Sequence, residues 1–436
     1  MNTDYFFVKH LLKYKGKTVG VELKNISNNE IIIIPNKRFV ELKGKLKNAE
    51  VLNNGVIRGI NTHLEVKNIT NEEMIELTRL FGIKQQLRPN EIKKYIIMWE
   101  DTEVLYFNKE NGKIKIINAD FLPYSLRNIK KLNGYKVLEW LKDRVTNIHR
   151  TYMNLIYIAR QVGRDVDKVI ADSAGLAITD HFWIKTTDTK VLKWDDLLKL
   201  KDKNEELNRI AVNGILKGGK ELRKDYTTLF TLKGYYPKYS YDGNLYKRKE
   251  DAIREYPAYL LAKQLNLPIA ECKIQGKLVK IELFVDNNVS LVHASELATY
   301  YECNVSSLNS IFAQLGRTDL MNQIDWLFIF NYLIGNVDLH SENFGFLFDN
   351  KTFKILSIAP FYDHNMSFRV NFDGELDDIG VNIEEWSKYT IAQYPQLCNA
   401  LHKLNLNVVK PYIKKDEYAA LIKRYNKLRE WSKGIK

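Results

Sequence analysis

Cysteine, proline and long hydrophobic runs are all scarce in this chain of 436 residues. Its three cysteines, Cys272, Cys303 and Cys398, form no CxxC pair, which excludes a small disulfide scaffold. Proline occurs only 9 times, so domain boundaries have to be inferred from changes in pattern. The one long apolar run, Ile324–Ile334, is too short to cross a bilayer and contains Asp325. We therefore expect neither a secreted mini-protein nor a membrane-spanning one.

Acidic residues are in the minority, with 53 Asp and Glu against 66 Lys and Arg, a formal net charge of +13. Such an excess favours attraction to polyanions but does not specify a fold. The hydrophobic fraction of 45% and charged fraction of 27% are those of a globular protein, which excludes wholesale disorder. The first residues lack an apolar stretch that ends in small residues, so we expect no secretory signal and a cytoplasmic location.

The spacing of apolar residues predicts a chain of mixed α and β structure. Glu30–Pro35 is β-branched and Val51–Val66 alternates apolar with polar residues, as strands do. Helical spacing runs from Gly134 to about Ala174, strand patterns return from Asp225, and the chain after Ser295 is mostly helical. A strand-rich block followed by a helical block is typical of a bilobal nucleotide-binding domain. We predict four segments: residues 1–135, 136–224, 225–295 and 296–436.

A carboxylate, an amide and a second carboxylate follow the apolar run. Asn343 comes five residues after Asp338, and Asp363 twenty residues after that. Phosphoryl transfer uses such a set, because one Asp accepts the hydroxyl proton while an Asn and a second Asp hold Mg²⁺ between the phosphates. The alternative is that they are ordinary loop residues, since Asp and Asn are common turn formers.

Two short apolar runs, Phe344–Phe348 and Phe353–Leu356, lie between Asn343 and Asp363. With Asp349–Asn350 as the turn they predict a hairpin, which would bring the amide and the second carboxylate to one end of a β-ribbon. His340 lies in the same segment. A structural role is the alternative for this histidine, and without a neighbouring His or Cys we expect no zinc site.

Lysines suited to phosphate precede this segment. Gly234 and Lys238 lie between two strand patterns, where backbone N–H groups and a lysine could cover a nucleotide. Lys247 lies in the next strand and Glu255 begins the following helix, the pairing by which kinases hold the α- and β-phosphates. The alternative is a plain basic hairpin.

The segment Gly214–Lys220 also fits the spacing G-x-x-x-x-G-K of a phosphate-binding loop. Glu221 follows where Mg²⁺ binding needs Ser or Thr, and no long helix follows. Because that motif requires a strand–loop–helix context, we interpret the segment as a loop.

Taken in order, these motifs resemble the HipA-type serine/threonine kinases, a bacterial family that includes toxins of toxin–antitoxin pairs. GNVDLHSENFGFLFD is similar to the family's catalytic loop G-N-x-D-x-H-x-x-N, and APFYD to its P-x-Y-D metal motif. REYPAYLLAKQLNLPIAECKI resembles the family's helix and strand, and IELFVD and LKGYYPK stand where the family has its hinge and glycine-rich loop. The matches run from about Asp225 to Asp363.

The resemblance implies an α+β, two-lobed protein-kinase-like fold with ATP and Mg²⁺ in the cleft. The first part of the chain, about 130 residues, is not covered by the resemblance, and its strand patterns predict a β-rich accessory region. Asp338 would be the base, Asn343 and Asp363 would bind Mg²⁺, and Lys247, paired with Glu255, would hold the phosphates. Thr231 stands where relatives can carry a self-phosphorylated serine. The remaining nucleotide-binding positions would be Lys233, Gly234, Tyr235, Tyr236, Pro237, Lys238, Glu282, Phe284, His340 and Tyr362.

Two functions remain open at this stage. The first is a Ser/Thr protein kinase whose substrate, by family analogy, could be a translation factor or an aminoacyl-tRNA synthetase, and which could have an antitoxin partner. The second is a kinase-like scaffold that binds nucleic acid through basic stretches with aromatic residues, such as Lys37–Lys47 and Tyr425–Lys436. For the latter stretch we favour a solvated helix face with Tyr425, Leu428 and Trp431 turned to the core. We expect no membrane association.

Overall fold

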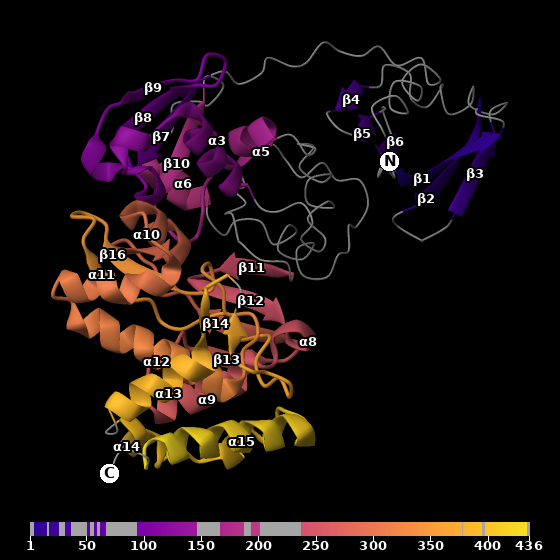
Figure 1. Ribbon diagram of the computed structural model, residues 1–436. Coiled ribbons are helices and arrows are strands. Elements are labelled where there is room, and N and C mark those ends of the chain that lie inside the picture. Colours follow the sequence, from indigo (N-terminus) through magenta and orange to yellow (C-terminus); the bar gives the residue numbers. More distant parts are fainter. Residues whose placement is uncertain are drawn as a thin grey trace.

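The chain is a mixed α and β protein in the computed structural model (Figure 1). The structure describes residues 4–14, 17–25, 31–35, 50–52, 56–58, 62–66, 94–145, 166–186, 193–200, 237–376, 378–394 and 397–433. Within these residues we find no helix with the length and hydropathy that a bilayer crossing requires.

The first described strands form a sheet in the order β3–β2–β1–β6–β5–β4. Their bounds are Asp4–Tyr14 for β1, Lys17–Asn25 for β2, Ile31–Pro35 for β3, Glu50–Leu52 for β4, Val56–Arg58 for β5 and Thr62–Val66 for β6. The strand patterns predicted at Glu30–Pro35 and Val51–Val66 are thus confirmed as β3 and as β4 to β6. Asn71, followed by Glu72 and Glu73, also predicts the start of a helix, and these residues lie outside the described part of the chain.

A second sheet, which we call the accessory sheet, has the order β10–β7–β8–β9. It consists of β7 (Lys94–Trp99), β8 (Thr102–Asn108), β9 (Lys113–Ile116) and β10 (Phe182–Thr186), and α3 (Gly134–Asp143), α5 (Val166–Ser173) and α6 (Trp194–Leu200) accompany it. Arg144, at the end of α3, donates to both carboxylate oxygens of Asp180 at 2.6 and 2.9 Å and to the Phe182 carbonyl at 2.7 Å. This buried fork ties α3 to the start of β10.

A third sheet, the Lys247 sheet, has the order β11–β12–β14–β13. Its strands are β11 (Lys238–Tyr241), β12 (Asn244–Arg248), β13 (Cys272–Gln275) and β14 (Leu278–Glu282), with α8 (Lys249–Ala252) and α9 (Glu255–Gln264) between β12 and β13. Asp242 and Gly243 both have positive φ, 46° and 67°. A two-residue hairpin turn of this kind matches the twist of the strands, as the Asp–Gly pair predicts.

The remainder of the described chain is mostly helical, as predicted, with a three-stranded sheet in the order β15–β16–β17 and a separate two-stranded sheet. Its elements are β15 (Val289–His293), α10 (Ala294–Tyr301), α11 (Leu308–Gln314), α12 (Thr318–Ile334), β16 (Gly345–Asp349), β17 (Ile355–Ile358), β18 (Glu375–Leu376), β19 (Val381–Asn382), α13 (Ile383–Gln393), α14 (Leu397–Leu401) and α15 (Lys415–Trp431). The predicted hairpin is β16–β17. The predicted boundary at residue 295 groups β15 with the Lys247 sheet, whereas β15 pairs with β16.

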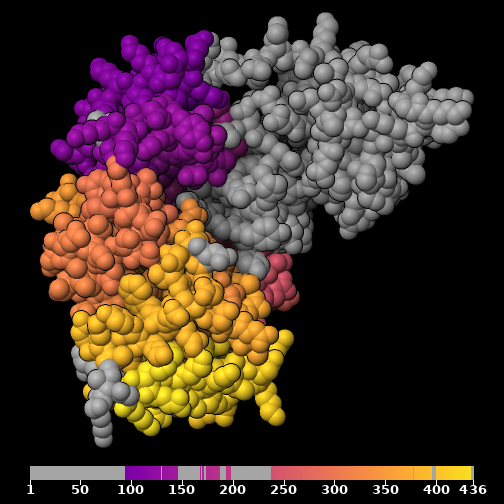
Figure 2. Space-filling model, in the orientation of Figure 1, coloured from indigo at the N-terminus to yellow at the C-terminus, as the bar shows by residue number. Residues whose placement is uncertain are grey.

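One continuous hydrophobic core joins the accessory sheet to the helical part, from Tyr95 to Leu428. Helix α12 contributes its second half, from Ile324 to Ile334, which is almost entirely buried although it includes Asp325 and Asn331. It ends at Gly335, whose φ of +61° forms a left-handed cap. In Figure 2 the purple surface of residues 94–145 lies directly against the orange surface of the helical part. The shared core holds the accessory sheet firmly on the helical part.

Candidate active site

Lys247 lies on β12 with its side chain on the buried face of the Lys247 sheet, only 3% exposed. Its ammonium group donates to Glu255 Oε1 at 2.6 Å and to Asp363 Oδ1 at 2.8 Å. Burial alone would lower the pKa of Lys247, but the two carboxylates outweigh it and raise this pKa above its ordinary value. The lysine is therefore a fixed cation between two acids.

Glu255, the first residue of α9, is 4% exposed and uses both carboxylate oxygens. While Oε1 accepts from Lys247, Oε2 accepts from the backbone N–H of His364 at 2.9 Å. One side chain thus fixes both the lysine and the residue that follows Asp363. The sequence predicts the pair with Lys247, but the contact to His364 gives no sequence signal.

Asp363 has a left-handed backbone, with φ of 64°, a conformation that costs energy outside glycine and is found at functional sites. Burial would raise the pKa of Asp363, but Lys247 and Lys238 overcome this effect and hold the pKa of this carboxyl well below its usual range. Asp363 is consequently a carboxylate at any pH at which the protein would work.

Lys238 and Lys247 are direct cross-strand partners on β11 and β12, and both are buried. Like charges at directly opposed positions of a sheet repel each other. Both lysines lower the pKa of Asp363. This face of the sheet therefore concentrates positive charge near one carboxylate. Such a face suits a polyanion better than a single acid.

The loop after α12 carries Asp338 and Asn343 and is held by its own amides. Asn336 Oδ1 accepts from the Asp338 N–H at 3.2 Å, and Asn343 Nδ2 donates to the Asp338 carbonyl at 2.6 Å. His340 closes the turn, since its carbonyl accepts from the Asn343 N–H at 2.8 Å and its Nδ1 from the Glu342 N–H at 3.2 Å. These bonds bring the three predicted residues of this loop together.

The pKa of Asp338 is raised above its ordinary value. Burial is the main cause and the nearby Asp363 adds to it, whereas His340, Asn343 and Lys247 act in the opposite direction. Asp363 and Lys247, which contact each other at 2.8 Å, thus lie within electrostatic reach of Asp338 although they are far from it in the sequence. A carboxyl with a raised pKa is suited to proton transfer.

Arg424 of α15 supports this loop from behind and was not predicted. It is 4% exposed and donates to the carbonyls of Leu333 at 3.0 Å and Arg369 at 2.9 Å. A Cβ at Gly335 would lie 2.5 Å from its Nη2, so only glycine fits there. The sequence signal was available, because Arg424 lies three residues after Leu421 and four before Leu428, on the buried face of the helix.

The predicted nucleotide positions are only partly brought together. Tyr362 donates to the Glu342 carbonyl at 3.1 Å, and its ring lies 5.5 Å from that of Phe284. The register pairs Lys247 with Val279, three positions before Glu282, so the exposed Glu282 side chain lies on the opposite face of the sheet. Only its backbone could face a nucleotide. Pro237 is buried directly before β11.

Five predicted residues fall outside the described part of the chain: Thr231, Lys233, Gly234, Tyr235 and Tyr236. The segment Gly214–Lys220 also lies outside it. The predictions for these residues stay as they stand.

The donor set fits Mg²⁺ bound together with phosphate. Among the described residues no group of three His, Cys, Asp or Glu side chains is placed to hold a metal, so a dedicated protein cage is not present there. Asn343 uses its amide nitrogen toward the Asp338 carbonyl, which directs its amide oxygen elsewhere. One carboxylate and one amide oxygen, completed by phosphate oxygens and water, match the way Mg²⁺ is bound in phosphoryl-transfer sites.

Comparison with known proteins identifies the class of this part of the chain. Residues 223–430 match the family model of the HipA-like C-terminal domain. This chain therefore carries a HipA-like domain, as its motifs indicate. No curated protein matches the chain.

Two solved structures are similar in part. HipA of Shewanella oneidensis MR-1, solved in a toxin–antitoxin complex with HipB and operator DNA, is 12% identical with a TM-score of 0.45, and the match covers 78% of this chain and 96% of that one. The proinflammatory kinase CtkA of Helicobacter pylori is 15% identical with a TM-score of 0.30, over 45% of this chain and 90% of that one.

Proposed function

We propose that this protein is an ATP- and Mg²⁺-dependent kinase that phosphorylates Ser or Thr in a protein. The observation that carries the proposal is the bridge of Lys247 to Glu255 and Asp363, at 2.6 and 2.8 Å, between the Lys247 sheet and the loop beyond β17. A lysine held by a helix glutamate next to a metal-binding aspartate is the arrangement that kinases use. In this proposal the Lys247 sheet belongs to one lobe, the helices from α10 onward form the other, and the nucleotide binds between them.

Each residue has a definite task in this proposal. Lys247, oriented by Glu255, holds the α- and β-phosphates, and Lys238 adds positive charge beside it. Asn343 and Asp363 hold Mg²⁺, which when bound neutralises charge on the phosphates. Asp338 accepts the proton of the substrate hydroxyl. Phe284 and Tyr362 line the adenine side, and Thr231 is a candidate for self-phosphorylation.

Finer points of biology belong to the same proposal. The HipA structure contains an antitoxin and operator DNA, which supports a toxin role and an antitoxin partner for this chain. The protein substrate would be a translation factor or an aminoacyl-tRNA synthetase by family analogy alone.

The alternative of direct nucleic-acid binding loses support at the last helix. Tyr425 donates to the Leu401 carbonyl at 3.1 Å, and the ring of Trp431 stacks on Tyr332 at 5.6 Å. Leu428 is fully buried. These aromatic side chains face the protein, so they are not presented for base stacking. The stretch Lys37–Lys47 lies outside the described residues.

The test is transfer of the γ-phosphate. Wild-type protein with labelled ATP and Mg²⁺ is expected to consume ATP and to label itself or an added protein, and Asp338→Ala and Asp363→Ala are expected to abolish this. If the wild type consumes no ATP and no phosphorylation appears at Thr231 or a neighbour, the proposed function is wrong.

A further inference from the structure

The segment 283–288, which we call the linker, connects the Lys247 sheet to β15. At its start the Leu283 N–H donates to the Gly243 carbonyl at 2.9 Å. At its end Asp286 Oδ1 accepts from the backbone N–H groups of Asn288 at 2.7 Å and Val289 at 3.0 Å. The side chain of Asp286 is thus used within the linker, and its carbonyl is directed elsewhere.

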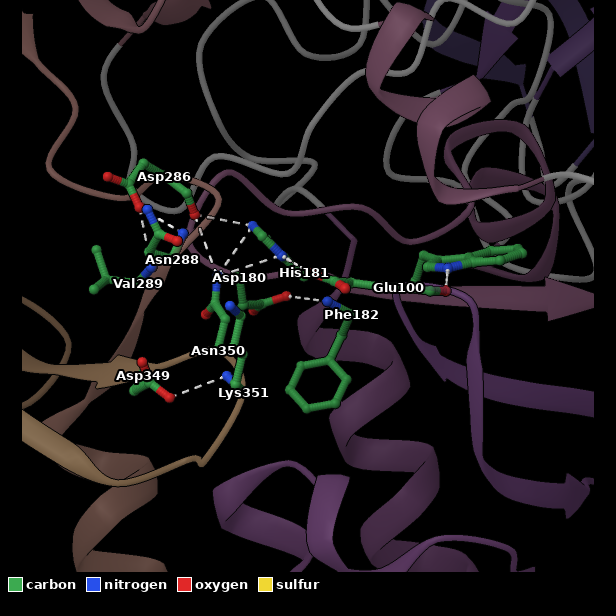
Figure 3. Close-up of polar contacts among 11 residues, drawn as sticks. Glu100, Asp180, His181, Phe182, Asp286, Asn288, Val289, Asp349, Asn350 and Lys351 are labelled. Carbon is green, nitrogen blue, oxygen red and sulfur yellow. Dashed lines mark hydrogen bonds and ion pairs between the residues drawn. The ribbon is translucent and has the colours of Figure 1, made fainter.

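That carbonyl is bound by residues from other parts of the chain (Figure 3). His181, which precedes β10 of the accessory sheet, places Nε2 at 3.1 Å from the Asp286 oxygen. Asn350, in the turn after β16, donates its Nδ2 to the same oxygen at 3.3 Å. Hydrogen bonds from the segment before β10 of the accessory sheet and from the turn after β16 therefore hold the linker in position.

His181 is held rigidly where it makes this contact. Its ring lies 5.5 Å from the ring of Trp99 and 4.8 Å from that of Trp194. Its Nδ1 lies 2.8 Å from Glu100 Oε1. A carbonyl oxygen can only accept, so Nε2 has to carry a proton, and the ring donates to Glu100 as well only when both nitrogens are protonated.

The other side of the linker faces the candidate active site. Phe284 packs on Tyr362 with 5.5 Å between ring centroids, and Tyr362 directly precedes Asp363. The Tyr362 hydroxyl is in turn 3.1 Å from Nδ1 of His293, the last residue of β15. A shift of the linker around Asp286 would therefore displace the apolar wall of the site, whereas Lys247 and Glu255 are held by their own contacts with each other, with Asp363 and with the His364 N–H.

We propose that His181 is a positioning residue for the nucleotide site: by binding the Asp286 carbonyl it fixes the linker, and the accessory sheet thereby sets the affinity for the adenine part of ATP. This inference rests on the proposed kinase function for its ligand. The contact between His181 and the linker does not depend on the kinase function, and it is tested separately.

Three variants of the full chain separate the contact from packing. In His181→Gln the amide nitrogen reaches about where Nε2 lies, so the bond to Asp286 is retained. In His181→Asn the amide lies about where Nδ1 lies, so that bond is lost. Gln and Asn lose the ring stacking on the tryptophans equally, and His181→Phe keeps a ring but loses both hydrogen bonds.

The first measurement is hydrogen–deuterium exchange of the amides of residues 283–288. We expect exchange about threefold to tenfold faster in His181→Asn and His181→Phe, the effect of losing one hydrogen bond, and near the wild-type rate in His181→Gln. Equal exchange in all four proteins would overturn the inference. So would equal acceleration in Gln and Asn, because it would mean that only ring packing matters.

The second measurement is binding of Mg²⁺–AMP-PNP compared with Mg²⁺–tripolyphosphate, which lacks adenosine. We expect His181→Asn and His181→Phe to weaken AMP-PNP about threefold to tenfold and to leave tripolyphosphate unchanged. Equal losses for both probes, or none, would overturn the role in adenine binding. If wild type binds neither probe, the proposed function fails, and the exchange data still decide whether His181 holds the linker.

Discussion

Lys247 and Asp363 are 116 residues apart in the sequence, yet their side chains meet at 2.8 Å. The contact joins the Lys247 sheet to the loop beyond β17. Glu255 accepts hydrogen bonds from Lys247 on one side and from the backbone N–H of His364, next to Asp363, on the other. Burying a cation between two carboxylates carries a large desolvation cost. Removing one partner leaves a buried charge uncompensated and destabilises the fold. The predictions below test what this arrangement does.

Glu255→Gln should impair both stability and phosphate transfer. Both carboxylate oxygens accept hydrogen bonds, from Lys247 and from His364 N–H, and an amide can replace only one acceptor. We expect a loss of about 1–3 kcal/mol of folding free energy in a denaturant titration, with transfer reduced at least about tenfold. Glu271→Gln, at an exposed position just before β13, is the matched control and should be neutral. Equal behaviour of the two variants would contradict the role of Glu255.

Asp338→Asn should separate chemistry from binding. The change removes the proposed base but keeps the shape of the side chain, so we expect the rate of transfer to fall about 10²- to 10⁴-fold. Binding of Mg²⁺–AMP-PNP should change little, and stability should not fall, because burial already disfavours the charged form of this residue. Retention of most of the transfer rate would exclude Asp338 as the base.

The pH dependence of transfer should reflect the raised pKa of Asp338. The base works only when deprotonated, so activity is lost as the pH falls through its folded-state pKa, which burial places above the ordinary range of an aspartate. The raised pKa also affects stability, because the folded state favours the protonated form of Asp338. This contribution to the free energy of unfolding is lost as the pH rises through the folded-state pKa of Asp338. A pH–rate profile with its acid limb at the position of an exposed aspartate would contradict this assignment.

Arg424→Met should destabilise the catalytic loop from behind. The change leaves the carbonyls of Leu333 and Arg369 without this buried donor, and each such loss costs about 1–3 kcal/mol. Burial lowers the pKa of Arg424 to about 10, which means that the site disfavours the charged form of the guanidinium group. We expect a lower midpoint of thermal unfolding and reduced transfer, whereas Lys423→Met, an exposed neighbour on α15, should change neither. A neutral Arg424→Met would show that the loop does not depend on α15.

The sequence predicts the local part of this site well. Asp338, Asn343 and His340 belong to one loop, and short-range turn chemistry after an apolar helix is enough to place them together. The hairpins at Asp242–Gly243 and β16–β17 follow from alternation and turn residues in the same way. The pairing of Lys247 with Glu255 follows from the way kinases combine a strand lysine with a helix glutamate.

Contacts that depend on register and on distant segments could not be predicted. The face-to-face placement of Lys238 and Lys247 requires the register of β11 on β12. The pairing of β15 with β16 crosses the predicted boundary at residue 295, because β15 pairs with a strand that lies far along the chain. Ser341 donates its N–H to Asp378 Oδ2 at 2.6 Å, a link to a segment with no motif. His181 carries no sequence signal for its contact with Asp286.

The most direct measurement is calorimetric titration of the wild-type chain with AMP-PNP, with Mg²⁺ and after its removal by a chelator, beside Asp363→Asn and Lys247→Met. Lys273→Met, on the exposed edge strand of the same sheet, serves as the control. We expect binding in the presence of Mg²⁺, weakened about tenfold or more by the chelator and by either site variant, and unchanged in the control. A wild-type chain that does not bind the nucleotide, or that binds it equally well when Asp363 and Lys247 are replaced, would contradict the assignment of this site.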